Sequence, residues 1–245
     1  MYQMDIRDSK QRIREEIWRK MEELNIARFP RPVYGRIPNF EGAEIAAKKL
    51  SETKEWKKAE VIFSNPDSPQ KYVRRQALFQ SKILIMATPR IKKGFLLLDP
   101  KKIPKWALNK ACTISGAFRF GIIKHPKVLP PIDMKVTGCV AVDIYGGRLG
   151  KGHGYSDLEW GILSEYGLID DSTITATTIH SIQIVDRIPM TEHDFPLDII
   201  VTQERIIYTN TEYRKPRGIF WDLAKERIQE IPILKELYEA REKIN

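Results

Sequence analysis

The sequence contains little cysteine and little histidine, which limits the chemistry available to it. Two cysteines and four histidines occur among its 245 residues. Cys112 and Cys139 do not have the spacing of a metal site and are too few for a disulfide framework. Both lie in apolar stretches, which is typical of buried thiols in a reducing compartment. We therefore exclude a disulfide-stabilised secreted domain and a cysteine-based metal centre.

Long apolar runs are also absent. No stretch is long and apolar enough to cross a membrane, and no signal-peptide pattern occurs, so we expect a cytoplasmic protein without a membrane partner. Apolar residues make up 42% of the chain and charged residues 30%, which is typical of a folded, soluble domain. No repeat or linker divides the sequence. We predict a single domain over residues 1–245, with a core at about 8–210 and a helical C-terminal extension at about 215–245.

The charge balance favours an anionic ligand. Lys and Arg number 41 against 32 for Asp and Glu, which gives a formal net charge of +9. Nucleotides, polyglutamates and nucleic acids all suit such a balance. The basic residues are spread along the chain, and no RNP motif or zinc-finger spacing occurs, so nucleic acid is the least favoured of these partners. The sequence does not indicate an oligomeric state.

The clearest functional motif is the glycine-rich stretch GRLGKGHGYSD at 147–157. It follows a strand-like run at 136–145 and precedes a helix-like run from Tyr155. Glycines leave backbone N–H groups free to approach an anion, and a helix N-terminus adds partial positive charge. Arg148 and Lys151 add full charges. This order of strand, glycine loop and helix predicts phosphate binding, and Asp157 is a candidate ligand for the Mg²⁺ that accompanies a nucleotide.

An alternative interpretation of this stretch is a glycine-rich turn that only joins a strand to a helix. The spacing of its glycines is not that of G-x-G-x-x-G, and no P-loop ending occurs. Two cations within a loop of three glycines favour the phosphate interpretation.

Hydrophobic periodicity predicts an amphipathic helix at 5–26. Lys10 and Arg14 lie four positions apart on it, so they point the same way and form a paired cationic site. An ordinary solvated helix face is the alternative interpretation of this pair.

In the rest of the chain, strand-like and helix-like periodicity alternate, and we expect strands and helices at the following residues. The expected strands are 59–65, 82–87, 94–99, 136–145 and 173–185, with a hairpin of 197–202 and 205–209. The expected helices are 41–53, 70–80, 104–118, 155–166, 218–229 and 233–243. This alternation predicts an α/β fold with a largely parallel sheet flanked by helices. Ligands of such folds bind at the carboxyl ends of the strands, where the 147–157 loop lies.

The stretch GRLGKGHGYSD resembles the signature of the 5-formyltetrahydrofolate cyclo-ligase family, roughly R-x-G-x-G-x-G-Y-Y-D. Two further elements agree in order: the Lys-x-x-x-Arg of the first helix, at Lys10 and Arg14, and Asp194 before a hydrophobic strand. The stretches RIPNF at 36–40 and GKGHGYSDLEW are similar to the branch of methenyltetrahydrofolate synthetase domain-containing proteins. The resemblance spans residues from about 8 to 205.

The resemblance implies a Rossmann-like fold related to sugar-phosphate isomerases and CoA-transferases. It also implies the ATP- and Mg²⁺-dependent closure of 5-formyltetrahydrofolate to 5,10-methenyltetrahydrofolate, with release of ADP and phosphate. The residues expected to offset the developing charge are Lys10, Arg14, Arg148 and Lys151. The residues expected to bind the nucleotide are Lys10, Arg14, Arg148, Leu149, Gly150, Lys151, Gly152, His153, Gly154 and Tyr155. The expected metal ligands are Asp157 and Asp194.

The chain departs from the family pattern at three positions. Ser156 replaces the second Tyr, Leu158 replaces the Arg that commonly follows the Asp, and Gln70 falls near the position of a folate-binding glutamate. A second hypothesis is therefore a cyclo-ligase-like nucleotide-binding protein that lacks this activity or acts on a modified pterin.

Several other residues have two interpretations. We interpret His153 and His193 as loop or turn residues rather than catalytic groups, and His180 as a core histidine. Tyr155 could equally pack against the protein or stack on a ring of the ligand. Asp198 could be a ligand-binding residue or an ordinary surface acid. Phe40 and Trp160 are candidates for a pterin pocket, although such aromatic residues are more often core residues.

Overall fold

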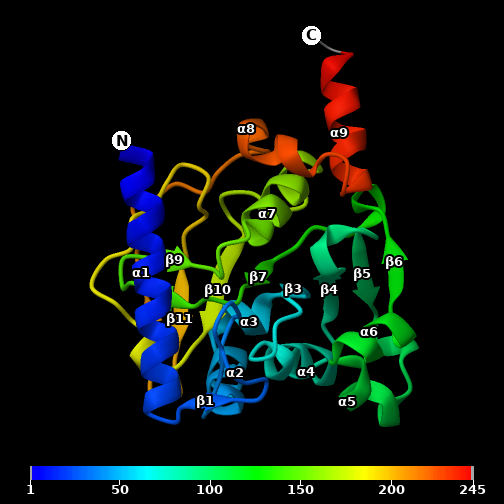
Figure 1. Cartoon of the computed structure of the whole chain (residues 1–245). Coiled ribbons are helices and arrows are strands. Elements are labelled where there is room, and N and C mark those ends of the chain that lie inside the picture. The colour runs from blue at the N-terminus through cyan, green and yellow to red at the C-terminus, as the bar shows by residue number, and fades with distance from the viewer. Residues whose placement is uncertain (1, 244–245) are drawn as a thin grey trace.

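Eight strands form the central sheet of the computed structural model, which describes residues 2–243 (Figure 1). In sheet order they are β12 (Ile206–Tyr208), β11 (Ile199–Val201), β10 (Ile174–Thr178), β7 (Met134–Val136), β3 (Val61–Ser64), β4 (Ile83–Ala87), β5 (Phe95–Leu98) and β6 (Ile122–Lys124). The five strands from β11 to β4 run parallel to one another. Strands β12, β5 and β6 add antiparallel edges. The predicted α/β fold, its largely parallel sheet and the late hairpin are confirmed.

Helices cover both faces of this sheet. They are α1 (Tyr2–Glu23), α2 (Ala43–Ser51), α3 (Lys54–Lys58), α4 (Lys71–Phe79), α5 (Leu108–Ala111), α6 (Ile114–Phe120), α7 (Tyr155–Glu165), α8 (Trp221–Ala224) and α9 (Pro232–Glu242). Short 3₁₀ turns lie at 89–91, 100–102, 105–107, 126–128, 181–183 and 225–227.

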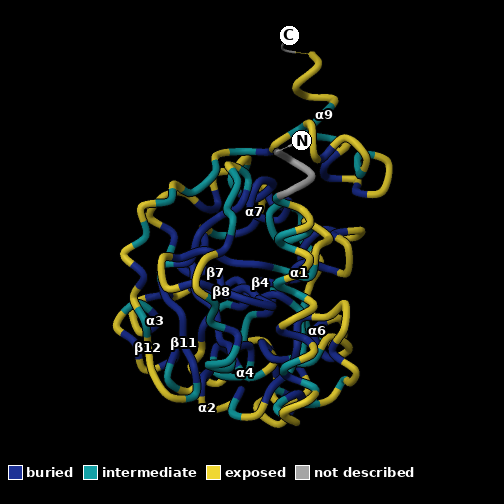
Figure 2. Tube along the Cα trace, turned by 60° about the vertical axis from the view of Figure 1, so that its left-hand side comes forward, coloured by how far each residue is buried: buried dark blue, intermediate teal, exposed yellow. Residues whose placement is uncertain are grey.

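The central strands bury side chains on both faces, which explains their almost continuous apolar sequence. On β3, Ile62 packs in the core beneath α2 and α4, and the next residue, Phe63, packs in the core with α7 and α9. On β4, Leu84 packs in the first of these two cores and Ile85 packs in the second. Figure 2 shows this buried interior between exposed outer segments. The sheet is thus the middle of three layers.

The predicted strand at 136–145 is wrong as a continuous element. Strand β7 ends at Val136, and the chain then leaves the sheet to form a separate hairpin of β8 (Ala141–Val142) and β9 (Arg148–Leu149). Asp143 fixes the turn, because its carboxylate accepts hydrogen bonds from the backbone N–H groups of Tyr145, Gly147 and Ile188. The glycine loop therefore follows a hairpin strand beside the main sheet. A second small ribbon joins β1 (Ala27–Arg28) to β2 (Asn39–Phe40).

Two other predicted elements are shorter than expected. The helix expected at 104–118 is broken, because the Thr113 hydroxyl caps a new helix by accepting from the N–H of Gly116. The strand expected at 173–185 ends at Thr178. His180 then caps a 3₁₀ turn, with its Nδ1 accepting from Ile182 N at 3.2 Å, so it is not a strand residue.

The C-terminal segment contains the two expected helices in altered form. The first is the single turn α8 followed by a 3₁₀ turn, and the second is α9, which extends beyond the sheet in Figure 1. None of the helices within residues 2–243 combines the length and apolar character needed to span a membrane.

Candidate active site

A cavity of about 1070 Å³ lies beside the glycine loop. Residues one or two positions after β3, β4 and β7 line it, namely Asn65, Thr88 and Gly138, so it sits at the carboxyl ends of three parallel strands. Ligand sites of open α/β sheets lie at this edge. The other walls come from α1, the glycine loop, the turn at 191–194 and the C-terminal segment at 216–227.

The glycine loop presents backbone donors to this cavity. Gly152 has a φ of 98° and Gly154 a φ of 67°, a region that residues with side chains rarely adopt. Gly154 precedes α7 and has no side chain with which to cap its first turn. The first N–H groups of a helix without such a cap are available to an anion, and the helix dipole favours negative charge there. The geometry therefore suits a phosphate group.

Helix α1 supplies two cations to the same cavity. Lys10 Nζ lies 2.6 Å from Asp194 Oδ2, and Arg14 Nε donates to the carbonyl oxygen of Gly150 at 2.8 Å. The Lys10 side chain is only 12% exposed. The solvated-face interpretation of this pair is therefore wrong. Burial lowers the pKa of Arg14, and the charge of Asp194 partly opposes that shift.

Arg148 is the most buried cation of the loop. Its guanidinium forms an ion pair with Asp157, donates to the carbonyl oxygen of Phe195, and lies 3.6 Å from the centre of the Phe195 ring. Arg148 also acts on Asp194 through its charge. It therefore holds Asp157 at the first turn of α7 and lies close to the second predicted metal ligand.

The remaining loop residues contact two different walls of the cavity. Lys151 Nζ lies 3.1 Å from Asp67 Oδ1, after β3, and the carbonyl oxygen of His153 accepts from Arg227 in the C-terminal segment at 2.6 Å. Burial, and then the charges of Lys151, Arg227, Arg90 and Arg14, lower the pKa of His153. Cations from four separate parts of the chain thus surround one loop residue.

Both predicted metal ligands line the cavity. Asp157 is paired with Arg148, and Asp194 is paired with Lys10. Within residues 2–243, no group of three or more His, Cys, Asp or Glu side chains is arranged to hold a metal ion. A site for Mg²⁺ in nucleotide-binding proteins commonly uses one or two carboxylates together with substrate phosphates, and this donor set fits that pattern.

Sequence reasoning missed a buried polar group beneath the cavity. Glu159 Oε2 accepts from Asn65 Nδ2 at 2.7 Å and from Lys135 Nζ at 3.1 Å. The ammonium of Lys135 is inside the fold, where burial lowers its pKa to about 8, although Glu159 raises it. A lysine in the middle of the apolar strand β7 was the available signal, because buried charges are normally paired.

Gln70 is also buried, and both polar atoms of its amide have no partner among the described residues. A Cβ added to Gly138, which lines the cavity, would lie 2.8 Å from Gln70 Oε1. The amide therefore sits directly behind the cavity wall. A buried polar group without a partner is costly and marks a position that a ligand or water can satisfy.

The aromatic residues considered for a pterin pocket are core residues. Phe40 is 3% exposed and Trp160 is 1% exposed, with the Trp160 ring stacked 5.0 Å from the Phe195 ring. Asp198 accepts from Thr175 and Lys215 and is not among the cavity residues. Tyr155 does line the cavity and lies beneath the guanidinium of Arg227.

Comparison with known proteins places these features in a family. Residues 6–203 match the model of the 5-formyltetrahydrofolate cyclo-ligase family. A Bos taurus methenyltetrahydrofolate synthase domain-containing protein is 40% identical over 242 residues, which cover 96% of this chain and 63% of that protein. The Mus musculus protein of the same name is 40% identical over 241 residues, which cover 96% and 64%. The chain thus spans less than two thirds of the length of these relatives.

Among solved structures, the NMR structure of Aquifex aeolicus 5,10-methenyltetrahydrofolate synthetase has a TM-score of 0.51 and 20% sequence identity. The match covers 82% of this chain and 93% of that chain. This likeness supports the α/β fold described above.

Proposed function

Because the chain belongs to the 5-formyltetrahydrofolate cyclo-ligase family, we propose that it converts 5-formyltetrahydrofolate to 5,10-methenyltetrahydrofolate, consuming ATP and releasing ADP and phosphate. The main observation in support of this proposal is that one cavity is lined by Lys10, Arg14 and Lys151 together with the glycine loop. Those three cations come from α1 and the loop, and they face the position where a phosphate chain would lie.

The phosphate part of the proposal is supported by charge and backbone geometry. The first turn of α7 and the loop 150–154 would hold the phosphates, while Lys10, Arg14 and Lys151 offset the charge that develops. Phosphoryl transfer depends mainly on positioning and on such charge neutralisation. Arg148 would act as a positioning residue, because its guanidinium is already engaged by Asp157 and Phe195.

In the proposed reaction, the formyl oxygen attacks the γ-phosphorus of ATP and ADP leaves. The product is an imidate-like phosphate on the formyl carbon. The N10 nitrogen then attacks that carbon, closes the ring and loses its proton, and the oxygen leaves with the phosphate. No step requires a nucleophilic side chain.

Asp157 and Asp194 are the residues that would hold Mg²⁺. The ion would supply positive charge to the phosphate oxygens when bound. Asp157 is paired with Arg148 and Asp194 with Lys10, so ion binding would compete with these two contacts.

The folate ring would bind at the wall formed by Asn65 and Gly138. Behind this wall lie the unpaired amide of Gln70 and the hydrogen-bonded Glu159. A ring edge with alternating donors and acceptors would supply partners for the Gln70 amide, whose two polar atoms have none among the described residues.

A second candidate function is a nucleotide-binding protein that lacks cyclisation or acts on a modified pterin. It is favoured by one observation: the neutral Gln70 lies near the position where the family pattern expects a glutamate, and a neutral amide cannot form the stronger, charge-assisted hydrogen bonds that a carboxylate forms.

Separate binding measurements distinguish the two functions. We expect isothermal titration to detect binding of both Mg·ATP and 5-formyltetrahydrofolate to the purified chain. Binding of Mg·ATP without binding of 5-formyltetrahydrofolate, or binding of both without formation of the methenyl product, would support the second function. Absence of Mg·ATP binding would contradict both.

A further inference from the structure

The C-terminal segment forms a wall of the cavity although it lies outside the residues that the family model matches. The model ends at residue 203, whereas the alignments with the bovine and mouse relatives cover 96% of the chain and so extend into this segment. Residues from 216 to 227 line the cavity. We call residues 216–227 the C-terminal wall.

One end of the C-terminal wall is fixed to α7. Trp160 Nε1 donates to the carbonyl oxygen of Pro216 at 2.7 Å, and the N–H of Ile219 donates to Glu165 Oε1 at 3.0 Å. The approach is close, because a Cβ added to Gly161 would lie 2.9 Å from the carbonyl oxygen of Gly218. This end is therefore held in one position against the helix that begins at the glycine loop.

The chain beyond the wall is fixed at a second place, in the core cluster that α7 also joins. Ile233 and Leu234 of α9 are buried in the core cluster that includes β4 and β5 residues. Glu236 accepts from His125 at 2.9 Å and from Lys127 at 2.5 Å. The wall thus spans two anchored points.

Between these two points, two apolar side chains of the C-terminal wall are only partly buried. Phe220 is 36% exposed and Leu223 is 44% exposed, and both line the cavity. The Phe220 ring lies edge-on to the His193 ring, with 6.0 Å between their centres. Apolar side chains that line a concave site beside polar groups are typical of a surface that binds the flat ring of a ligand.

The wall is joined directly to the phosphate-binding loop. Arg227 Nη2 donates to the carbonyl oxygen of His153 at 2.6 Å, and its guanidinium lies 4.3 Å from the centre of the Tyr155 ring. The opposite contact of the loop, between Lys151 and Asp67, leads to the polar wall assigned to the folate. A nucleotide with its phosphates on the loop can therefore place its base against the apolar wall and leave the polar wall to the second substrate.

We propose that Phe220 and Leu223 bind the purine base of the nucleotide, with the His193 ring beside it. This inference rests on the proposed function, since it assumes that the glycine loop holds the phosphates of ATP. Purine bases bind well to aromatic side chains, because every base has a π-face that can stack.

The test compares ATP with inorganic tripolyphosphate, which has the same phosphate chain and no base. Removal of one side chain that contacts the purine ring should weaken ATP binding about tenfold, which corresponds to about 1.4 kcal/mol. We expect Phe220→Ala and Leu223→Ala each to weaken ATP binding by about this factor in titration calorimetry. Their affinity for tripolyphosphate should stay at the wild-type value.

Two further variants control for folding and for the chemistry of the contact. Asp222→Ala removes a neighbouring side chain that is 94% exposed and does not line the cavity, so ATP affinity should not change. Phe220→Tyr retains the ring and should retain ATP affinity. Thermal unfolding of all four variants should give midpoints close to that of the wild type, because Phe220 and Leu223 are partly exposed.

Three outcomes would overturn this inference. The first is unchanged ATP affinity in Phe220→Ala and Leu223→Ala. The second is an equal loss for ATP and tripolyphosphate, which would assign the wall to the phosphates or to the shape of the loop. The third is a loss of affinity for 5-formyltetrahydrofolate with unchanged ATP binding, which would assign the wall to the folate ring. If the wild type binds ATP and forms methenyl product in each case, the proposed function stands without this inference.

Discussion

Lys10 Nζ lies 2.6 Å from Asp194 Oδ2, although 184 positions separate the two residues in the chain. The two side chains are 12% and 10% exposed, and Thr191 donates its hydroxyl to the same carboxylate oxygen at 2.7 Å. The pair joins α1 to the turn at 191–194. It therefore closes one side of the cavity, so both residues have a structural role besides the ligand-binding role proposed for them.

The first prediction concerns the pH dependence of this pair. Burial alone would raise the pKa of Asp194, but the charges of Lys10 and Arg148 and the hydrogen bonds from Lys10 and Thr191 bring it below its ordinary value. A carboxylate with a lowered pKa stabilises the fold above about pH 4 and loses that contribution as pH falls through its folded pKa. We expect Asp194→Asn to lower the unfolding midpoint at pH 7, and the difference from wild type to shrink towards pH 3.

Asp222→Asn is the control for this pH series. Asp222 pairs with Lys225 at the surface, where an exposed ion pair contributes little stability, so its removal should leave the midpoint nearly unchanged at pH 7. A constant difference between wild type and Asp194→Asn from pH 7 to pH 3 would contradict the account of Asp194.

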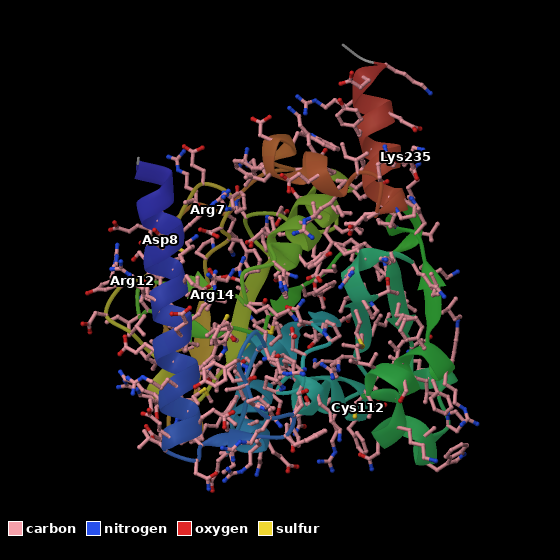
Figure 3. The ribbon with its side chains drawn as sticks, viewed as in Figure 1. Arg7, Asp8, Arg12, Arg14, Cys112 and Lys235 are labelled. Carbon is pink, nitrogen blue, oxygen red and sulfur yellow. The ribbon has the colours of Figure 1, made fainter. Side chains whose placement is uncertain are left out.

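The second prediction separates the ligand-binding role of α1 from its structural role. Arg14 donates to Gly150 from the cavity side of α1, whereas Arg12 is exposed and does not line the cavity. Figure 3 shows the two side chains on different sides of the helix. Loss of a phosphate contact should cost about 10- to 100-fold in turnover or in ATP affinity. We expect this loss for Arg14→Ala and no loss for Arg12→Ala.

Thermal unfolding should show that Arg14→Ala remains folded. Lys10→Ala is a less specific variant, because it would also leave Asp194 buried without its main partner, so both its stability and its activity should fall. Equal ATP affinity in Arg12→Ala and Arg14→Ala would mean that the helix contributes only to the structure.

The third prediction uses two glycines of the loop. A Cβ added to Gly150 meets no atom within 4 Å, and its φ is outside the left-handed region. Gly150→Ala should therefore fold normally, and any loss of ATP affinity would come from a clash with the ligand. We expect at least a tenfold loss by titration calorimetry. Wild-type affinity in this variant would contradict phosphate binding at the loop.

Gly152→Val should abolish ATP binding for a second reason. Gly152 has a φ of 98°, which a β-branched residue adopts only with strain. Gly167→Ala is the matched control, because Gly167 also has a positive φ, of 64°, but does not line the cavity. It should lower stability and keep ATP affinity.

The fourth prediction concerns the buried pair of Lys135 and Glu159. Removal of one partner of a buried pair leaves an uncompensated charge and typically costs about 3–5 kcal/mol, whereas removal of both is much less costly. We expect Lys135→Met to be strongly destabilised in denaturant unfolding and Lys135→Met/Glu159→Gln to recover most of the loss. A double variant that is as unstable as the sum of both single variants would contradict this coupling.

Because the pKa of Lys135 is lowered to about 8, its contribution to the stability of the fold depends on pH. The folded protein releases this proton at lower pH than the unfolded chain, whose lysines have a pKa of about 10.4. The unfolded chain therefore binds more protons between these values, and the contribution of Lys135 to stability rises with pH there. The stability difference between wild type and the double variant should shift in favour of the wild type from pH 8 to pH 10.

The glycine loop and the Lys10 and Arg14 pair could be predicted because their signals are local. The glycines and cations of 147–157 are contiguous, and the two α1 residues follow helical spacing. The hydrophobic strands β3 and β4 were predicted for the same reason, since short apolar runs between turn residues specify them. Their parallel direction followed from the alternation of strands and helices, whereas their order in the sheet was not predicted.

The other half of the site could not be predicted, because it depends on contacts between distant parts of the chain. Arg227 reaches His153 across 74 positions, and nothing in the sequence near Arg227 indicates that contact. The strand expected at 136–145 was overestimated because the chain leaves the sheet after Val136, and Cys139 and Val142 then pack in a small separate core. Nothing in the sequence around Phe40 and Trp160 showed whether their side chains would line the cavity or pack in the core.

The most direct measurement of the central claim is the absorbance of 5,10-methenyltetrahydrofolate formed by the purified chain from 5-formyltetrahydrofolate and Mg·ATP, with ADP measured in parallel. We expect methenyl product to accumulate only when ATP is present, with ADP released in equal amount, and we expect Arg14→Ala to lower both rates together. A folded chain that binds Mg·ATP and 5-formyltetrahydrofolate but forms no methenyl product would contradict the central claim.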